Sequence, residues 1–113
     1  VPLIKAIGVE KETDLLNIRS YENFVDYILL DSKEKGDLKG GRGIRFNWNI
    51  ISGFNFNKPW FLAGGLNANN VMDAMKATGA KMLDVSTGVE NTPGKKSFDK
   101  MRKFIGRANG EFI

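Results

Sequence analysis

Two segments of the sequence end in clusters of small residues that could bind an anion. Residues 61–71 (FLAGGLNANNV) and 82–95 (MLDVSTGVENTPGK) each begin as an apolar, strand-like run and then open toward a helix. Small residues at such a turn let backbone N–H groups approach an anion, and a helix N-terminus adds partial positive charge. The last two loops of a (β/α)₈ barrel hold phosphorylated substrates in this way. The pattern predicts a phosphate site at the residues that end the two runs, namely Gly64, Gly65, Ser86, Thr87 and Gly88.

A carboxylate at the end of another apolar run could supply acid–base chemistry. Asp31 follows the run at 24–30, and burial beside Leu29 and Leu30 would keep its carboxyl protonated more of the time. Barrel enzymes carry their chemistry at the carboxyl ends of strands, so Asp31 is the candidate general acid. The alternative is an aspartate that only caps the start of a loop.

A second carboxylate, Asp84, lies on the same strand face as Met82 and Ser86 by two-residue alternation. Pointing inward, it could hold sugar hydroxyls of a substrate. Alternatively, it is a buried aspartate bonded to the backbone or to Lys5.

The composition narrows the chemistry further. Histidine and cysteine are both absent, which excludes disulfides, cysteine-rich zinc sites and any Ser-His or Cys-His pair within this chain. Acid–base work must therefore fall to carboxylates, Lys or Tyr. The net charge of +4 comes from 17 basic residues scattered among 13 acids, which favours an anionic small molecule over nucleic acid. No apolar run approaches the roughly 20 residues that cross a bilayer, so no membrane partner and a cytoplasmic location are predicted.

The elements that must position these residues alternate along the chain. Strands are expected at 2–9, 24–30, 60–65 and 81–86, and helices at 12–22, at 46–51 as a short turn, after Asn67 up to Gly79, and from Ser97 to Gly110. Strict alternation predicts an α/β protein with a parallel sheet and helical crossovers. We interpret the 113 residues as one domain of TIM-barrel type that supplies about four βα units, a half barrel. A four-stranded open parallel sheet is the alternative.

The motifs KAIGV (5–9), LLDSK (29–33), GGRGIRFNW (40–48), LAGGLNANNV (62–71) and DVSTGVENTPGKK (84–96) resemble the phosphoribosylanthranilate isomerase family. They span nearly the whole chain in the family's order, and they match its C-terminal half, strands five to eight. The family's N-terminal half carries a catalytic cysteine that has no counterpart here. Two departures are Arg42, where the family usually has a small hydroxyl residue, and FNW at 46–48, where FDW is usual.

The resemblance implies an isomerase of tryptophan biosynthesis. Its reaction is the Amadori rearrangement of N-(5-phosphoribosyl)anthranilate to 1-(2-carboxyphenylamino)-1-deoxyribulose 5-phosphate, which needs no cofactor and no metal. By resemblance, Asp31 is the general acid, Asp84 and Gly41 bind substrate, and the small residues at the two strand ends bind its phosphate. Lys95 and Lys96 are expected to be surface charges.

The implied partner is a complementary N-terminal half barrel, or a second copy of the chain through self-association. The alternative function is a non-catalytic half-barrel fragment that acts as an assembly or phosphate-binding unit. A further alternative is another phosphate-handling barrel, such as a pentose phosphate epimerase or the next enzyme of the tryptophan pathway. The sequence DVSTGVE argues against that last alternative.

Overall fold

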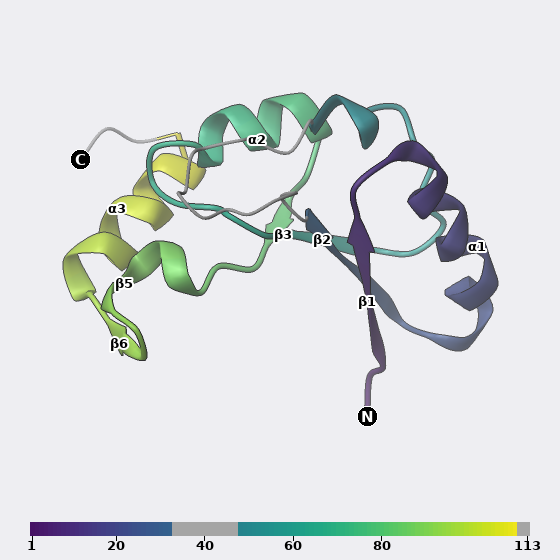
Figure 1. Cartoon of the computed structure of the whole chain (residues 1–113), viewed down its shortest axis with the longest axis horizontal. Coiled ribbons are helices and arrows are strands. Elements are labelled where there is room, and N and C mark those ends of the chain that lie inside the picture. The colour runs from purple at the N-terminus through teal and green to yellow at the C-terminus, as the bar shows by residue number, and fades with distance from the viewer. Residues whose placement is uncertain (33–47, 111–113) are drawn as a thin grey trace.

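The computed structural model describes residues 1–32 and 48–110, and within them four parallel strands form one sheet. The strands lie side by side in chain order (Figure 1): β1 (Ile4–Val9), β2 (Tyr27–Ser32), β3 (Trp60–Ala63) and β4 (Met82–Leu83). The prediction of an α/β protein with a parallel sheet is confirmed. Of the residues discussed above, Gly41, Arg42 and Asn47 lie outside the described residues.

Helical segments connect the strands and flank the sheet. In chain order they are η1 (Glu12–Leu16), α1 (Asn17–Tyr21), η2 (Glu22–Phe24), η3 (Trp48–Ile50), α2 (Val71–Thr78), η4 (Thr87–Val89) and α3 (Phe98–Ala108). α2 ends at Gly79, whose φ of +80° is the left-handed conformation that glycine adopts most readily. α3 begins after Ser97, whose hydroxyl oxygen accepts a hydrogen bond from the Lys100 N–H at 3.1 Å. Both of these helix boundaries were predicted from the sequence.

The expected start of the second strand is wrong by three residues. Residues 22–24 form the 3-10 turn η2, and β2 begins only at Tyr27. The reason lies in Asp26, whose carboxylate accepts a hydrogen bond from the Leu3 N–H at 2.8 Å. The N–H groups of Asp26 and Tyr27 in turn donate to the Leu3 carbonyl at 2.9 and 3.1 Å. These bonds set the register at which β2 joins β1.

One face of the sheet carries the hydrophobic core. Ile7, Leu30 and Leu62 align across neighbouring strands, and each is at most 5% exposed. The core continues into the helical layer through residues such as Ile18 and Val71, both fully buried. The three α-helices therefore pack around a single side of the sheet (Figure 1).

The opposite face of the sheet is apolar as well, but no described helix covers it. Ala6, Leu29, Phe61 and Met82 align across the four strands on this face, and all are half-buried or exposed. The rings of Tyr27 and Phe61 pack together there at 5.7 Å between centroids. We call this surface the open face.

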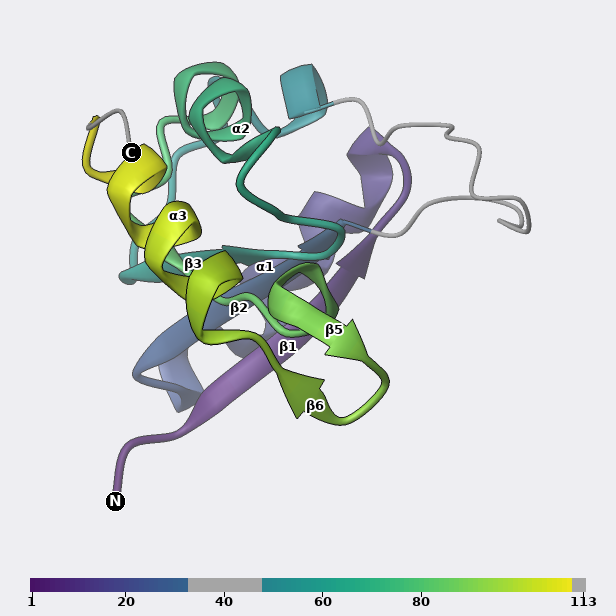
Figure 2. The same ribbon diagram turned by 90° about the vertical axis from the view of Figure 1, so that its left-hand side faces the viewer.

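The segment between α2 and α3 differs most from prediction. A strand was expected over 81–86, but β4 is only Met82–Leu83, extended by one hydrogen bond from the Asp84 N–H to the Leu62 carbonyl at 2.9 Å. A hairpin of β5 (Glu90–Thr92) and β6 (Lys95–Lys96) then precedes α3, and it was not predicted (Figure 2). The dipeptide Pro93-Gly94 was its sequence signal, since Gly94 turns the chain with φ of +82°.

Candidate active site

The predicted site residues meet in one cavity at the carboxyl ends of β2, β3 and β4. The cavity measures about 200 Å³. Its lining residues are Leu29, Asp31, Ala63, Gly64, Gly65, Leu66, Asp84, Val85, Ser86, Thr87 and Gly88. Every site residue predicted from the sequence is therefore present in one place, except Gly41, which lies outside the described residues.

Two larger hollows lie away from this edge of the sheet. One of about 380 Å³ lies between η1 and residues 50–54, and one of about 540 Å³ lies at the amino ends of β1 and β2. Neither is formed by the small residues that end parallel strands. Because ligands of α/β proteins bind at the carboxyl ends of the strands, the smaller cavity is the candidate site.

The turn after β3 owes its shape to two glycines and an asparagine. Gly64 and Gly65 have φ of +97° and +68°, in the left-handed region that strongly favours glycine. Asn70 holds the turn from both sides: its side-chain amide donates to the Gly65 carbonyl at 2.8 Å, and its side-chain oxygen accepts from the Asn67 N–H at 2.8 Å. Sequence reasoning missed Asn70, although its spacing of three from Asn67 is a recognisable turn signal.

The segment after β4 touches this turn directly. A Cβ atom added at Gly88 would overlap the Leu66 carbonyl oxygen and lie 2.9 Å from the Leu66 carbonyl carbon and 3.1 Å from the Asn67 Cα. Only a residue without a side chain permits this approach. The tips that end β3 and β4 therefore form one continuous wall of the cavity, as the phosphate prediction requires.

The helix toward which residues 82–95 were expected to open begins only after Ser97, and the residues at the second tip, directly after β4, form the single 3-10 turn η4. η4 is three residues long, so it contributes little of the aligned dipole that a longer helix provides. An anion at this tip would depend on individual N–H and O–H donors of Ser86, Thr87 and Gly88. This corrects the expectation that a helix dipole strengthens the second tip.

The two carboxylates lie on the open face near the cavity. Asp31 aligns with Gly8 of β1 and Ala63 of β3, which places it on the same face as Leu29. The expected burial of Asp31 is wrong for the described chain: its side chain is exposed, because no described residue packs over that part of the face.

Asp84 is also exposed, and its interaction with Lys5 is not formed. Lys5 aligns with Ile28 on the core face, and its ammonium lies 4.4 Å from the centroid of the Tyr21 ring. The two side chains therefore leave the sheet on opposite sides. Asp84 is left pointing toward the cavity that it lines.

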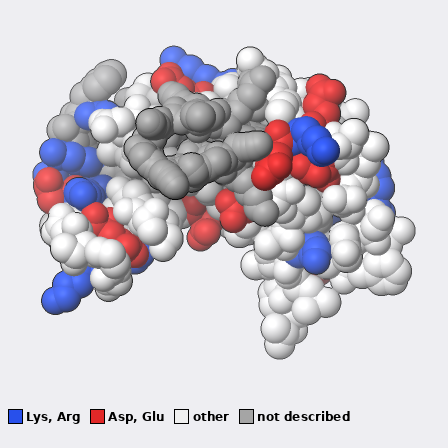
Figure 3. Space-filling view, in the orientation of Figure 1, with Lys and Arg blue, Asp and Glu red and all other residues white. Residues whose placement is uncertain are grey.

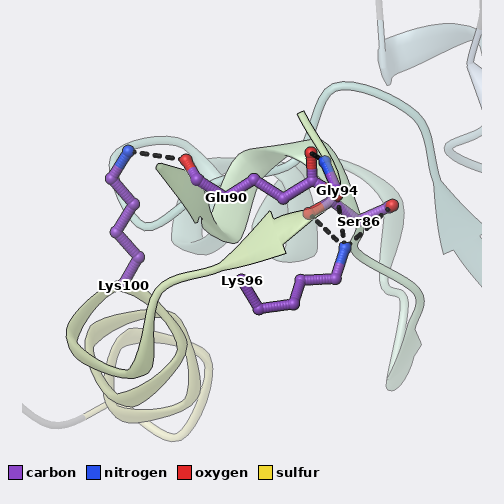
Figure 4. Close-up of polar contacts among 5 residues, drawn as sticks. All are labelled: Ser86, Glu90, Gly94, Lys96 and Lys100. Carbon is purple, nitrogen blue, oxygen red and sulfur yellow. Dashed lines mark hydrogen bonds and ion pairs between the residues drawn. The ribbon is translucent and has the colours of Figure 1, made fainter. Parts of the chain in front are cut away.

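Lys96 is the functional candidate that the sequence interpretation missed. It was expected to be a surface charge, but its Nζ donates to the Ser86 carbonyl and to the Ser86 hydroxyl, both at 3.2 Å (Figure 4). The same Nζ lies 2.6 Å from the Glu90 carboxylate. Hydrogen bonds from Lys96 and from the Gly94 N–H lower the pKa of Glu90.

Basic side chains are frequent on α3 and on the β5–β6 hairpin. Figure 3 shows Lys and Arg side chains over α3 and the β5–β6 hairpin at one end of the molecule. The sequence of these two elements contains Lys95, Lys96, Lys100, Arg102, Lys103 and Arg107, of which Lys96 pairs with Glu90 and both Arg102 and Lys103 pair with Asp99. Among the described residues, no group of three or more Asp, Glu, His or Cys side chains could hold a metal ion, and no helix is long and apolar enough to span a bilayer.

Comparison with known protein families shows to which family the chain belongs. The sequence model of the family described as N-(5'phosphoribosyl)anthranilate (PRA) isomerase matches residues 1–107. The chain belongs to the phosphoribosylanthranilate isomerase family. Among individual relatives, the N-(5'-phosphoribosyl)anthranilate isomerases of Paracoccus denitrificans and Cereibacter sphaeroides are 42% and 44% identical to it. The alignments cover 100% and 96% of this chain, but 54% and 52% of those relatives.

Solved structures of phosphoribosylanthranilate isomerases share the fold. The enzyme from Thermotoga maritima superposes with a TM-score of 0.79 at 38% identity, over 97% of this chain and 52% of that one. A second phosphoribosylanthranilate isomerase, in complex with reduced 1-(o-carboxyphenylamino)-1-deoxyribulose 5-phosphate, gives 0.75 at 35% identity, over 97% and 50%. The chain therefore spans about half the length of the family members it matches.

Proposed function

We propose that residues 1–113 are the C-terminal half of a (β/α)₈ phosphoribosylanthranilate isomerase, supplying strands five to eight of its barrel. The observation that carries the proposal is the cavity at the strand ends, where the Asp31 carboxyl group lies beside two turns made of small residues. An acid next to an anion-binding wall is what the Amadori rearrangement of a phosphorylated aminosugar requires. Membership of the family supports the same reaction.

In this proposal each part of the cavity has a separate task. The Asp31 carboxyl donates its proton to the furanose ring oxygen as the C1–O bond breaks, and the nitrogen lone pair forms the C=N bond of an imine. A base then removes the proton from C2, and the resulting enolamine tautomerises to the ketone. Asp84 and Gly41 contact the substrate's sugar and anilino groups, and the two tips hold its phosphate. No cofactor or metal takes part.

The base is the part that this chain does not provide. In the family to which the chain belongs, the N-terminal half carries the catalytic cysteine, so we propose that the base comes from a complementary N-terminal half. A reconstituted pair would therefore be active, and the chain alone would not. The cytoplasmic location remains a prediction of the sequence.

Uncovered apolar surfaces support a complementary half as the partner. The open face of the sheet would form the interior of a closed barrel. Exposed apolar side chains also flank the two ends of the sheet: Leu16 and Phe24 beside α1, and Phe98 and Ile105 on α3, each at least 59% exposed. Helices on one side of a sheet with sequential strand order fit a barrel, since a doubly wound sheet carries helices on both faces.

Co-expression tests the proposed function. The chain would be produced alone, and together with the N-terminal half of the Paracoccus denitrificans relative, and the rate of phosphoribosylanthranilate isomerisation would be measured for each. We expect isomerisation only when both parts are present. A well-formed complex without isomerisation would contradict the proposal and favour the non-catalytic assembly or phosphate-binding unit.

A further inference from the structure

We propose that Lys96 is a positioning residue that orients Ser86 and Thr87 for the phosphate group of the substrate. The inference rests on the proposed function, because the phosphate it concerns is that of the proposed substrate. Lys96 lies outside the cavity lining, and from the sequence it was expected to be only a surface charge.

The geometry of the Lys96 ammonium excludes a direct role as the phosphate's counter-charge. A lysine ammonium has three N–H donors. All three have acceptors here: the Ser86 carbonyl and the Ser86 hydroxyl at 3.2 Å, and the Glu90 carboxylate at 2.6 Å. The positive charge is largely neutralised by Glu90. Lys96 must therefore act through Ser86.

Two consequences follow for the tip that Lys96 holds. Because the Ser86 hydroxyl oxygen accepts from Lys96, its proton is directed to another acceptor, such as a phosphate oxygen in the cavity that Ser86 lines. The Ser86 carbonyl accepts from Lys96 and from the Val89 N–H, both at 3.2 Å, so the Thr87 N–H of the same trans peptide points the opposite way. Ser86 and Thr87 thus present two donors on the side away from Lys96.

The hairpin keeps Lys96 in this position. Glu90 and Lys96 face each other across β5 and β6, and the Glu90 carboxylate also accepts from the Gly94 N–H at 3.3 Å. The Lys100 ammonium of α3 donates to the Glu90 carbonyl at 2.9 Å (Figure 4). The Ser97 N–H donates to the Val89 carbonyl at 2.7 Å, which also fixes the hairpin to its surroundings. Lys96 is therefore held by the protein before any ligand arrives.

The neighbouring lysine supplies a matched control for the test. Lys96→Met and Lys95→Met remove the same charge from the same strand, but only Lys96 contacts Ser86. Binding of inorganic phosphate would be measured by calorimetry, and the KM of the substrate and the Ki of anthranilate would be measured in the reconstituted enzyme. We expect Lys96→Met to weaken phosphate binding and to raise KM by about tenfold or more, as loss of charge-assisted positioning should do. The Ki of anthranilate, which has no phosphate, should change by less than about twofold, as should every quantity in Lys95→Met.

Glu90→Gln separates positioning from simple hairpin stability. This variant keeps an acceptor for Lys96 and removes a negative charge near the phosphate, so phosphate should bind about twofold to threefold more tightly. If Lys96 only stabilises the hairpin, Glu90→Gln and Lys96→Met would weaken phosphate binding together, and that result would overturn the inference. Equal phosphate affinities of Lys96→Met and Lys95→Met would overturn it as well. An inactive reconstituted wild type whose phosphate affinity still falls in Lys96→Met would instead contradict the proposed function alone.

Discussion

At the scale of single residues, the missing side chain of Gly88 is what lets the two strand tips meet. An alanine there would collide with backbone atoms of Leu66 and Asn67, which cannot rotate away as a side chain would. The tips must then separate, and the donors on them no longer converge on one anion.

Gly88→Ala should therefore damage the cavity more than the fold. We expect its affinity for inorganic phosphate to fall by roughly tenfold or more, with a loss of about 1–3 kcal/mol in the free energy of unfolding. Gly53→Ala is the control: Gly53 has φ of +89° and open space around its Cβ position, so alanine there should cost about 1–2 kcal/mol in stability without affecting phosphate affinity. Equal loss of phosphate affinity in both variants would mean that the effect is general instability.

Asp31 is the residue on which the proposed chemistry depends. Asp31→Asn keeps the shape of the side chain but removes the acidic proton, so isomerisation by the reconstituted enzyme should fall by roughly a hundredfold or more. Phosphate affinity should stay within about twofold, because the donors proposed to hold phosphate lie in the turns after β3 and β4. Steady-state kinetics and phosphate titration would measure the two effects. Parallel loss of both would argue against Asp31 as the acid.

The sequence pattern was sufficient to select residues that meet in one cavity. Small residues and carboxylates at the ends of apolar runs are visible in a short window, and seven of them meet in the cavity. The exposure of Asp31 could not be predicted, because burial depends on what packs over the strand. Lys96 was missed for a similar reason: its partner Ser86 is ten residues away and becomes a neighbour only through the hairpin.

At the scale of elements, β4 is an edge strand whose pairing with β3 ends early. An edge strand forms its hydrogen-bond ladder on one side only, and here that ladder ends with the Asp84 N–H. The sequence pattern at 81–86 therefore predicted a strand correctly, but the hydrogen-bonded strand is shorter than the pattern. The hairpin that follows was hidden by the short length of its strands, two and three residues.

The helical turns before β2 are held to the rest of the chain by Glu22. This carboxylate is 7% exposed, pairs with Arg19 at 2.6 Å and accepts from the Asn57 side chain at 3.1 Å. Burial by itself would raise the pKa of Glu22, but the hydrogen bond from Asn57 and the charge of Arg19 outweigh it and lower that pKa. The folded state therefore binds a proton at Glu22 less readily than the unfolded state does.

Acid should remove the stabilisation that Glu22 provides. A lowered folded pKa means that this contribution is complete above the unfolded value of about 4.3, and that it is lost as pH falls through the folded value. Thermal unfolding of the wild type and of Glu22→Gln would be compared from pH 7 to pH 3. We expect the wild type to be the more stable at pH 7, with the difference shrinking below about pH 4.3. A difference that stays constant with pH would contradict this assignment.

At the scale of the whole molecule, the open face should determine how the chain associates. An apolar sheet face with exposed Phe98 and Ile105 at one end is unfavourable in water, so the isolated chain should self-associate. Addition of the complementary N-terminal half should replace those assemblies by a one-to-one complex. Sedimentation velocity measures both states. A chain that stays monomeric alone and does not bind the N-terminal half would contradict the half-barrel proposal.

The central claim is that two strand tips form a single phosphate site. The most direct measurement is an NMR titration of the chain with inorganic phosphate, following the backbone amides of both tips. We expect the amide signals of Gly65, Thr87 and Gly88 to shift together with one dissociation constant, while those of Gly53 and Gly94 stay unchanged. Shifts limited to one tip, or spread among surface lysines with no common constant, would contradict it.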